Sequence, residues 1–331
     1  MCAGLHHVTL YVHISWEIVL ILHSIHISLW EDELYEKDKP GVEKYKWERV
    51  VKPVLFLSAL LSVFSIAAIA VYIFAEGFPA IHKIGLLQFI FGMKWNPSGQ
   101  EPSYGIFPMI YASVAGTLGA AFLAIPIGMF TAVFLAVIAP SFLSNLIRPC
   151  VDLMVGIPSV IYGYFGLTVI VPYISEHLGG PGNSLLAVII LLTFMILPTI
   201  VKITEGSLQA VPREILEGSY ALGANQAETV FRIMIPAAKS GILASVVLGI
   251  GRAIGETMAV ILVCGNAVQI PRSLLDMVRP MTANIALEIS YADPFHEQVL
   301  FATGVILFFF IMMLNGATRF LAGKDRRVNR S

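Results

Sequence analysis

Charged residues are scarce in this sequence, at 13% of 331 positions, while 57% of the residues are hydrophobic and the mean hydropathy is +0.79. A soluble domain of this size could not carry that balance on its surface, so the composition indicates an integral membrane protein. The 21 Lys and Arg residues nearly balance the 22 Asp and Glu residues. Because the net charge is near zero, the chain has no global field for a polyanion, and no nucleic-acid partner is expected.

Cysteine is also scarce, and the motifs of common enzymes are missing. Cys2, Cys150 and Cys264 lie far apart with no paired spacing, which gives no support to a disulfide framework or a zinc site. The sequence has no G-x-x-x-x-G-K-[ST] phosphate loop, and His296-Glu297 lacks the second His of a zinc protease motif. No serine or cysteine nucleophile has a nearby base. We therefore expect a chain that is not an enzyme and that binds no metal or other cofactor itself.

Long apolar runs are abundant instead. A helical crossing of a bilayer needs about 20 predominantly apolar residues. The candidate spans cover residues 53–75, 107–138, 149–172, 185–201, 240–262 and 299–321. These runs predict an all-α, polytopic transmembrane bundle of six spans, surrounded by membrane lipid.

Lys and Arg gather on one side of this topology, as they do in cytoplasmic loops. Of the 21 such residues, Arg252 alone lies deep inside a span, Arg319 lies at the C-terminal end of the last span and is counted with the tail, and the opposite side holds only Lys83, Lys94, Arg272 and Arg279. The rest lie in the approach to the first span, in the second and fourth loops and in the C-terminal tail. Both termini are therefore expected to be cytoplasmic.

We expect an N-terminal extension and cytoplasmic lead-in at 1–50, a transmembrane domain at 51–322 with a cytoplasmic loop at about 203–239, and a basic tail at 323–331. Histidines cluster around a broken apolar run between Trp16 and Trp30. This run makes a poor seventh span and lacks the features of a signal peptide. The histidine spacings fit no known metal site. A weakly structured extension, or a start codon assigned too far upstream, explains the segment better.

The loop between the fourth and fifth spans carries clear helix start and stop signals. Pro212 suits a first helical turn, and Gly223 suits a helix end. Asn225 and Glu228 have the spacing of a capping box. The helix before Gly223 is too short to bury its own bulky apolar residues, which are Ile215, Leu216, Tyr220 and Leu222. Such a helix indicates either a surface for a partner or a hairpin packed under the bundle.

The same loop resembles the cytoplasmic docking loop of ABC-importer permeases, whose pattern is E-A-A-x-x-x-G, nine residues, I-x-L-P. Gly218 and Ser219 replace the two alanines of that pattern, and Ile235 replaces the leucine. The resemblance implies a short helix that sits in a groove of a separate ATPase subunit, which uses ATP and Mg. The docking residues that it implies are Glu217, Gly218, Ser219, Gly223, Ile233 and Pro236.

Arg252 is the single cation deep inside a span, where a charge costs about 2.5 to 3.5 kcal/mol on insertion scales. Glu256 follows four residues later, so in a continuous helix the two side chains share a face and can pair. The pair either orients the helix as a buried ion pair or places Arg252 on an anion path, restrained by Glu256. Gly249, Gly251 and Gly255 allow close approach to this backbone.

A narrower resemblance covers most of the chain. The segments 156–163 (GIPSVIYG), 195–200 (MILPTI) and 251–260 (GRAIGETMAV) resemble, in this order, the PstC family of permease subunits of bacterial phosphate ABC importers. The resemblance implies a type I ABC importer permease (MetI-like) fold in the bacterial inner membrane. It also implies a PstA-like permease subunit, a PstB-like ATPase dimer and a periplasmic phosphate-binding protein as partners. Its implied substrate path contains Arg252, Glu256, Thr257 and Ser159.

Several alternatives stay open from the sequence. The Gly156-to-Ser159 segment either breaks the third span beside the path or is a simple proline kink. Molybdate and sulfate permeases share the general docking loop, while a secondary transporter or channel has no need of one. The loops at 76–106 and 264–298 either receive a solute-binding protein or cap the bundle. In them, Trp95 is expected in the aromatic belt, and 273–277 and 282–288 are expected as short helices.

Overall fold

The computed structural model describes residues 48–328, so the expectations for residues 1–47 and for the last three residues lie outside the described part. The chain divides into two compact units, Met1–Phe78 and Pro79–Ser331. The described part of the first unit is the greater part of helix α2 (Glu48–Ile84). Phe56, Leu57 and Phe64 of this helix expose more than half of their surface. Because α2 is apolar around its circumference, it requires an apolar environment such as lipid.

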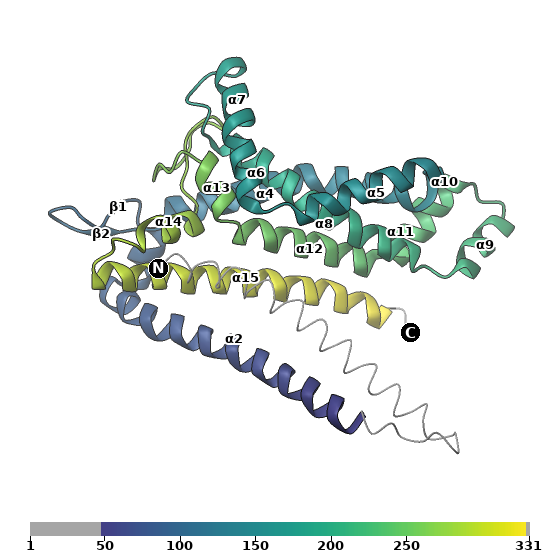
Figure 1. Ribbon diagram of the computed structural model, residues 1–331, viewed down its shortest axis with the longest axis horizontal. Coiled ribbons are helices and arrows are strands. Elements are labelled where there is room, and N and C mark those ends of the chain that lie inside the picture. The colour runs from purple at the N-terminus through teal and green to yellow at the C-terminus, as the bar shows by residue number, and fades with distance from the viewer. Residues whose placement is uncertain (1–47, 329–331) are drawn as a thin grey trace. The chain divides into compact units, whose positions relative to one another are not determined.

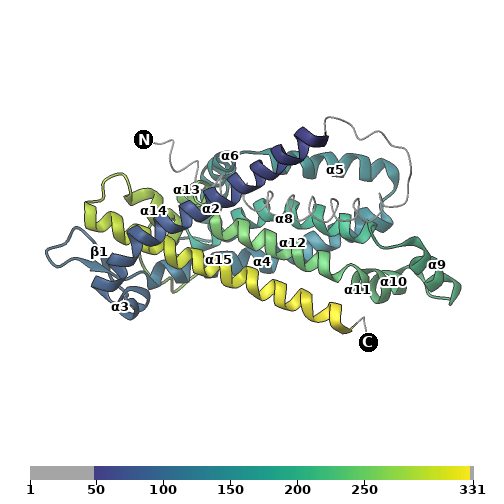
Figure 2. The ribbon, with the colours of Figure 1, turned by 90° about the horizontal axis from the view of Figure 1, so that it is seen from below.

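The core of the second unit consists of three long helices that lie side by side (Figures 1 and 2). They are α4 (Phe107–Val133), which continues as the π-helical turn η2 (Phe134–Ile138), α8 (Leu185–Gln209) and α12 (Lys239–Gly255). Glycines allow close contact at their crossings: a Cβ added to Gly128 would lie 2.8 Å from Ile200, and one added to Gly249 would lie 3.2 Å from it. The three helices therefore form one tightly packed body.

Four described helices are long and apolar enough to cross a membrane, and up to six crossings exist if each of two bent pairs counts as one. The long helix at the C-terminal end is α15 (Pro294–Val328), which continues without a break past the expected end of the permease domain at residue 322. The six expected spans and the helical bundle agree with this range. The first of the two bends lies within the expected third span, and the second lies between the expected cytoplasmic loop and the expected fifth span.

The first bent pair joins α5 (Ser141–Gly156) to the segment 159–177 at an angle of 100°. That segment contains α6 (Ser159–Phe165), η3 (Gly166–Ile170) and α7 (Val171–His177). Since the chain turns at Ile157 and Pro158 by far more than a simple kink, the structure favours a broken third span over the alternative of a proline kink. A residue before proline is disfavoured in the helical region, and Ile157 is indeed extended, with ψ of 125°.

The expected fifth span, 240–262, is also broken. Helix α12 ends at Gly255, and α13 (Met258–Val263) begins after two non-helical residues. In the second bent pair, α12 is joined at 70° to the segment 226–237 that precedes it. The apolar run in the sequence therefore consists of two helices.

One end of the second unit carries short elements (Figure 1). They are α3 (Leu86–Phe91), an antiparallel hairpin of β1 (Trp95–Asn96) and β2 (Ser103–Tyr104), and α14 (Met281–Glu288). The expected short helix at 282–288 is confirmed as α14. The one expected at 273–277 is wrong, because the Asp276 carboxylate accepts the backbone N–H groups of Arg272 and Ser273 and closes a turn there.

Candidate functional site

The loop between α8 and α12 lies at the other end of the second unit from α14 (Figures 1 and 2). It contains α9 (Arg213–Ala221), α10 (Gln226–Thr229), η4 (Val230–Met234) and α11 (Ile235–Ala237). Gly223 follows α9 with φ of +87°, a conformation that glycine adopts without strain. The Asn225 side chain accepts the Glu228 N–H at 2.9 Å, and the Glu228 carboxylate accepts the Asn225 N–H at 3.0 Å. The predicted helix end and capping box are both confirmed.

Helix α9 is fixed to the next helix by a buried contact. Ser219 Oγ and Thr229 Oγ1 lie 3.0 Å apart, which joins α9 to α10. Leu216 packs against the buried cluster of Val211, Val230 and Met234. The hydroxyl pair and this cluster give the loop a defined shape although its helices are short.

Apolar side chains are exposed on the outer face of the loop. Leu222 is 92% exposed, and Ile215 and Tyr220 are exposed by 46% and 45%. Glu217, Gly218, Gly223 and Pro236 are exposed as well, while Ile233 is half-buried. Of the four apolar residues that the sequence singled out, only Leu216 turns inward. The face therefore has the composition of a surface that a partner covers.

The expected pairing of Arg252 with Glu256 is wrong. Because α12 ends at Gly255 and Glu256 has an extended backbone with ψ of 129°, the two residues do not share a helix face. The Glu256 carboxylate instead accepts the backbone N–H of Ala259 at 3.2 Å, at the start of α13. Arg252 Nη1 lies 3.5 Å from Thr199 Oγ1 on α8. The guanidinium is thus directed to α8, half-buried and without a carboxylate partner among the described residues.

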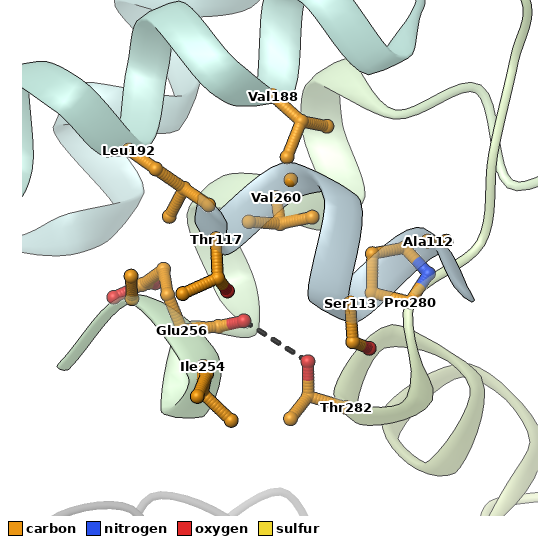
Figure 3. Close-up of a pocket in the computed structure, with 12 residues that line it drawn as sticks. Ala112, Ser113, Thr117, Val188, Leu192, Ile254, Glu256, Val260, Pro280 and Thr282 are labelled. Atoms are coloured by element: carbon orange, nitrogen blue, oxygen red, sulfur yellow. Dashed lines mark hydrogen bonds between the residues drawn. The ribbon is translucent and has the colours of Figure 1, made fainter. Parts of the chain in front are cut away.

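A small pocket lies at the break between α12 and α13 (Figure 3). Its walls come from α4, α8, α12, α13 and the first residues of α14, and Glu256 is its charged residue. The hydroxyls of Ser113, Thr117 and Thr282 line it, amid apolar side chains. The pocket has a volume of about 10 Å³, which is the space of a single water molecule.

The structure places the four expected path residues unequally. Glu256 lines the pocket, and Arg252 lies one helical turn before it on α12. Thr257 is buried beside the pocket, and its hydroxyl donates to the Gly255 carbonyl at 3.2 Å. Ser159 begins α6, outside the pocket lining. The pocket hydroxyls were missed, because isolated Ser and Thr residues in an apolar helix carry no spacing signal.

A second polar group, also missed, lies beside the hairpin. We name Trp95, Arg279, Glu288 and His296 the outer clamp. The Glu288 carboxylate accepts from Arg279 Nη1 at 2.6 Å and from Trp95 Nε1 at 2.9 Å, and it lies 2.9 Å from His296 Nε2. Trp95 was expected at the level of lipid headgroups, yet its indole N–H is bound within the protein. The clamp joins β1, α14 and α15 around one buried carboxylate.

Two groups near the outer clamp titrate away from their ordinary range. Burial raises the pKa of Tyr291, the negative charge of Glu288 raises it further, and Arg279 opposes the increase. Burial also raises the pKa of the Cys264 thiol to about 11. Both groups are therefore neutral near pH 7, and Cys264 is a poor nucleophile. No cluster of three or more metal-ligating side chains is found within residues 48–328.

The broken spans, the pocket and the exposed helical loop are together typical of a membrane permease that is driven by a separate partner protein. Residues 124–327 match the family described as binding-protein-dependent transport system inner membrane component. The chain belongs to this family. It is therefore a permease subunit of an ABC importer of the inner membrane, whose energy and substrate come from ATPase and binding-protein partners.

Similar proteins support this assignment. The probable ABC transporter permease protein YqgH of Bacillus subtilis (strain 168) is 36% identical over 265 residues, which cover 77% of this chain and 86% of that protein. The phosphate transport system permease protein PstC of Haemophilus influenzae is 31% identical over 297 residues, 84% of this chain and 93% of that protein.

The fold is also that of a solved transporter. A chain of the MetNI methionine ABC transporter, from an inward-facing crystal form, is 21% identical and has a TM-score of 0.53. The similarity covers 65% of this chain and 93% of that one. At this level of sequence identity the similarity establishes the fold alone and carries no information about the substrate.

Proposed function

We propose that this chain, together with a homologous PstA-like subunit, forms the translocation path for inorganic phosphate across the inner membrane. Its motor is a PstB-like ATPase dimer, and a periplasmic phosphate-binding protein delivers the substrate. ATP and Mg are used by the ATPase, and both termini of this chain are cytoplasmic. The similarity to proteins named PstC supports the choice of phosphate.

The connection between the docking loop and the pocket carries the proposal of ATP-driven transport. The loop that contains Glu217 and Gly223 begins where α8 ends and finishes where α12 starts. The same two helices line the pocket at their far ends, α8 with Val188 and Leu192 and α12 with Ala253 and Ile254. Because helices transmit displacement along their length, a pull on the loop by the ATPase moves two walls of the pocket.

Arg252 supports an anionic substrate. It lies on the segment that ends at the pocket, and it has no carboxylate partner among the residues that the structure describes. Arginine donates several hydrogen bonds in a planar fork that matches the oxygens of phosphate. A cation held in an apolar bundle by one hydroxyl has donors to spare for an oxyanion in transit.

The test is uptake of radiolabelled phosphate by the complex reconstituted in proteoliposomes. The Arg252→Gln variant should take up phosphate about tenfold to a hundredfold more slowly, because it loses a charge-assisted hydrogen bond to the passing anion. Arg252→Lys retains the charge and part of the uptake. Lys202→Gln is the matched control, because Lys202 pairs with Asp152 at 2.7 Å on an exposed part of α8.

The same experiment distinguishes the alternatives. An excess of unlabelled phosphate should suppress uptake, whereas suppression by molybdate or sulfate alone would assign the path to another oxyanion. Uptake that continues without ATP would indicate a secondary transporter or channel. Normal uptake by Arg252→Gln would limit Arg252 to a structural role.

A further inference from the structure

The π-helical turn η2 (Phe134–Ile138) is in contact with the loop between α8 and α12. Ala136 and Val137 of this turn pack against a buried cluster that contains Val230, the first residue of η4. A hydrogen bond adds to the contact, because Gln226 Nε2 on α10 donates to the Val137 carbonyl at 3.4 Å. A displacement of the loop therefore acts on η2 as well as on α8 and α12.

The same turn is in contact with α5, the first half of the broken third span. Leu135 of η2 is buried in a cluster with Val151 of α5 and Val201 of α8. Only Ala139 and Pro140 separate η2 from the start of α5 in the chain. Single π-helical turns within α-helices are frequent at functional sites. This one contacts both the loop and α5.

One side chain of α5, that of Arg148, joins three of these elements. Its Nε donates to Glu205 Oε1 on α8 at 2.8 Å, and its Nη2 donates to the Leu135 carbonyl of η2 at 3.3 Å. Gln209 Nε2, one turn after Glu205, donates to the same carboxylate oxygen at 3.0 Å. Glu205 is buried, so its carboxylate holds the planar guanidinium in place, and the second donor of that guanidinium holds η2.

A second ion pair joins α5 to α8 without this third partner. Lys202 Nζ lies 2.7 Å from Asp152 Oδ1, one turn further along α5 than Arg148. These two side chains are exposed, and exposed pairs contribute little to stability. Because both pairs connect the same two helices, they allow the link to η2 to be tested separately from the contact between α5 and α8.

Helix α5 is connected in turn to the pocket, through α6 and α13. The Tyr162 hydroxyl of α6 donates to the Met154 carbonyl of α5 at 2.8 Å, across the break in the third span. The next residue, Gly163, approaches α13 so closely that an added Cβ would lie 2.7 Å from Ala259. The residue after Ala259 is Val260, which lines the pocket. A contiguous set of contacts therefore runs from the loop through η2, α5 and α6 to a pocket wall.

From these contacts we propose that Arg148 is a positioning residue for energy coupling, which makes α5 follow the displacement that the ATPase imposes on the loop between α8 and α12. The inference rests on the proposed function, because the loop is displaced only if an ATPase docks on it. It adds α5 and the broken third span to α8 and α12 as elements that receive the movement.

The test measures phosphate taken up per ATP hydrolysed by the complex reconstituted in proteoliposomes. Arg148→Met combined with Glu205→Gln removes both charges and leaves the Gln209 amide as a partner for the new side chain at position 205. Uptake per ATP should fall about two- to thirtyfold, the range for a change within a set of coupled contacts. Since no charge is left buried alone, a merely structural role of the ion pair predicts a normal ratio.

Asp152→Asn combined with Lys202→Gln is the matched control. It removes the other ion pair between α5 and α8 and should leave uptake per ATP unchanged. Arg148→Lys keeps the charge beside Glu205 but replaces two donor nitrogens by one, so it should lower the ratio less than the double change does. If the double variant does not assemble, a normal ratio in Arg148→Lys overturns the inference.

A normal ratio in the Arg148 and Glu205 double variant overturns the role of Arg148, as does an equal fall in the control. If the parent complex carries molybdate or sulfate in place of phosphate, the substrate assignment fails, and the ratio measured with that anion still tests Arg148. If the parent carries phosphate and the double variant keeps its ratio, the assignment stands and the role of Arg148 fails. Uptake by the parent without ATP overturns both.

Discussion

Replacing Glu288 by alanine should destabilise the second unit far more than removing any exposed carboxylate. Glu288 is the buried centre of the outer clamp, with three polar groups within 2.9 Å of its carboxylate. Removing one partner of a buried ion pair costs about 3–5 kcal/mol. Arg279 keeps its bonds to the Asn266 carbonyl at 2.8 Å and to Asn284 Oδ1 at 3.1 Å, so its charge is not left bare. We therefore expect the lower end of the range, about 3 kcal/mol.

The free energy of unfolding of Glu288→Ala can be measured in mixed micelles by titration with SDS, followed by circular dichroism. The control is Asp152→Ala, which removes the carboxylate that pairs with Lys202. Those two side chains are exposed by 57% and 50%, so this change should cost at most about 1 kcal/mol.

A double-mutant cycle isolates the contribution of the ion pair. Glu288→Ala combined with Arg279→Ala should cost less than the sum of the single changes, by about 0.5–3 kcal/mol, because Arg279 has already lost its carboxylate partner when it is replaced. The reasoning is refuted if Glu288→Ala costs no more than Asp152→Ala, or if the two clamp variants are additive.

Two further predictions concern glycines. Gly223→Val forces a β-branched residue to φ of +87°, which costs about 1–2 kcal/mol. In the reconstituted complex, Gly223→Val and Glu217→Ala should each lower phosphate uptake per ATP hydrolysed about tenfold. Gly218→Ala, whose added Cβ meets open space, should not lower it. Loss of coupling in Gly218→Ala alone would contradict the docking assignment. Gly163→Ala places a Cβ 2.7 Å from the backbone of α13 and should lower the free energy of unfolding, measured by SDS titration, by about 1–3 kcal/mol. Gly156→Ala, whose added Cβ meets open space, should leave it nearly unchanged. Equal stability of the two variants would contradict the close packing of α6 on α13.

The local structure of the loop between α8 and α12 was predicted well because its signals act over short distances. The Asn225 and Glu228 side chains bond to each other's backbone, three residues apart, and the positive φ of Gly223 is a property of that residue. Such features form whenever the local chain is helical, so the spacing of the residues is enough to predict them.

The break in the fifth span could not be predicted from the same kind of pattern. The predominantly apolar segment from residue 240 to 262 favours a continuous helix, and on that helix Arg252 and Glu256 face each other. In the structure α13 packs against α6 at Gly163, and the Glu256 carboxylate bonds to the backbone at the start of α13. Tertiary packing therefore outweighed the local preference for helix.

The sequence by itself determined that this chain is a helical membrane protein, where its apolar spans lie and where the short helices of the loop at 203–239 begin and end. Hydrophobic periodicity, helix capping and charge placement depend on residues that are close together in the sequence, so they can be read from the sequence alone. Only the tertiary structure decided the pocket and the outer clamp. Trp95 and Glu288 are 193 positions apart, and Met281 and Ser113 are 168 apart. No local pattern specifies such pairs, since they form only when separate helices pack together and bury a polar group that then requires a partner.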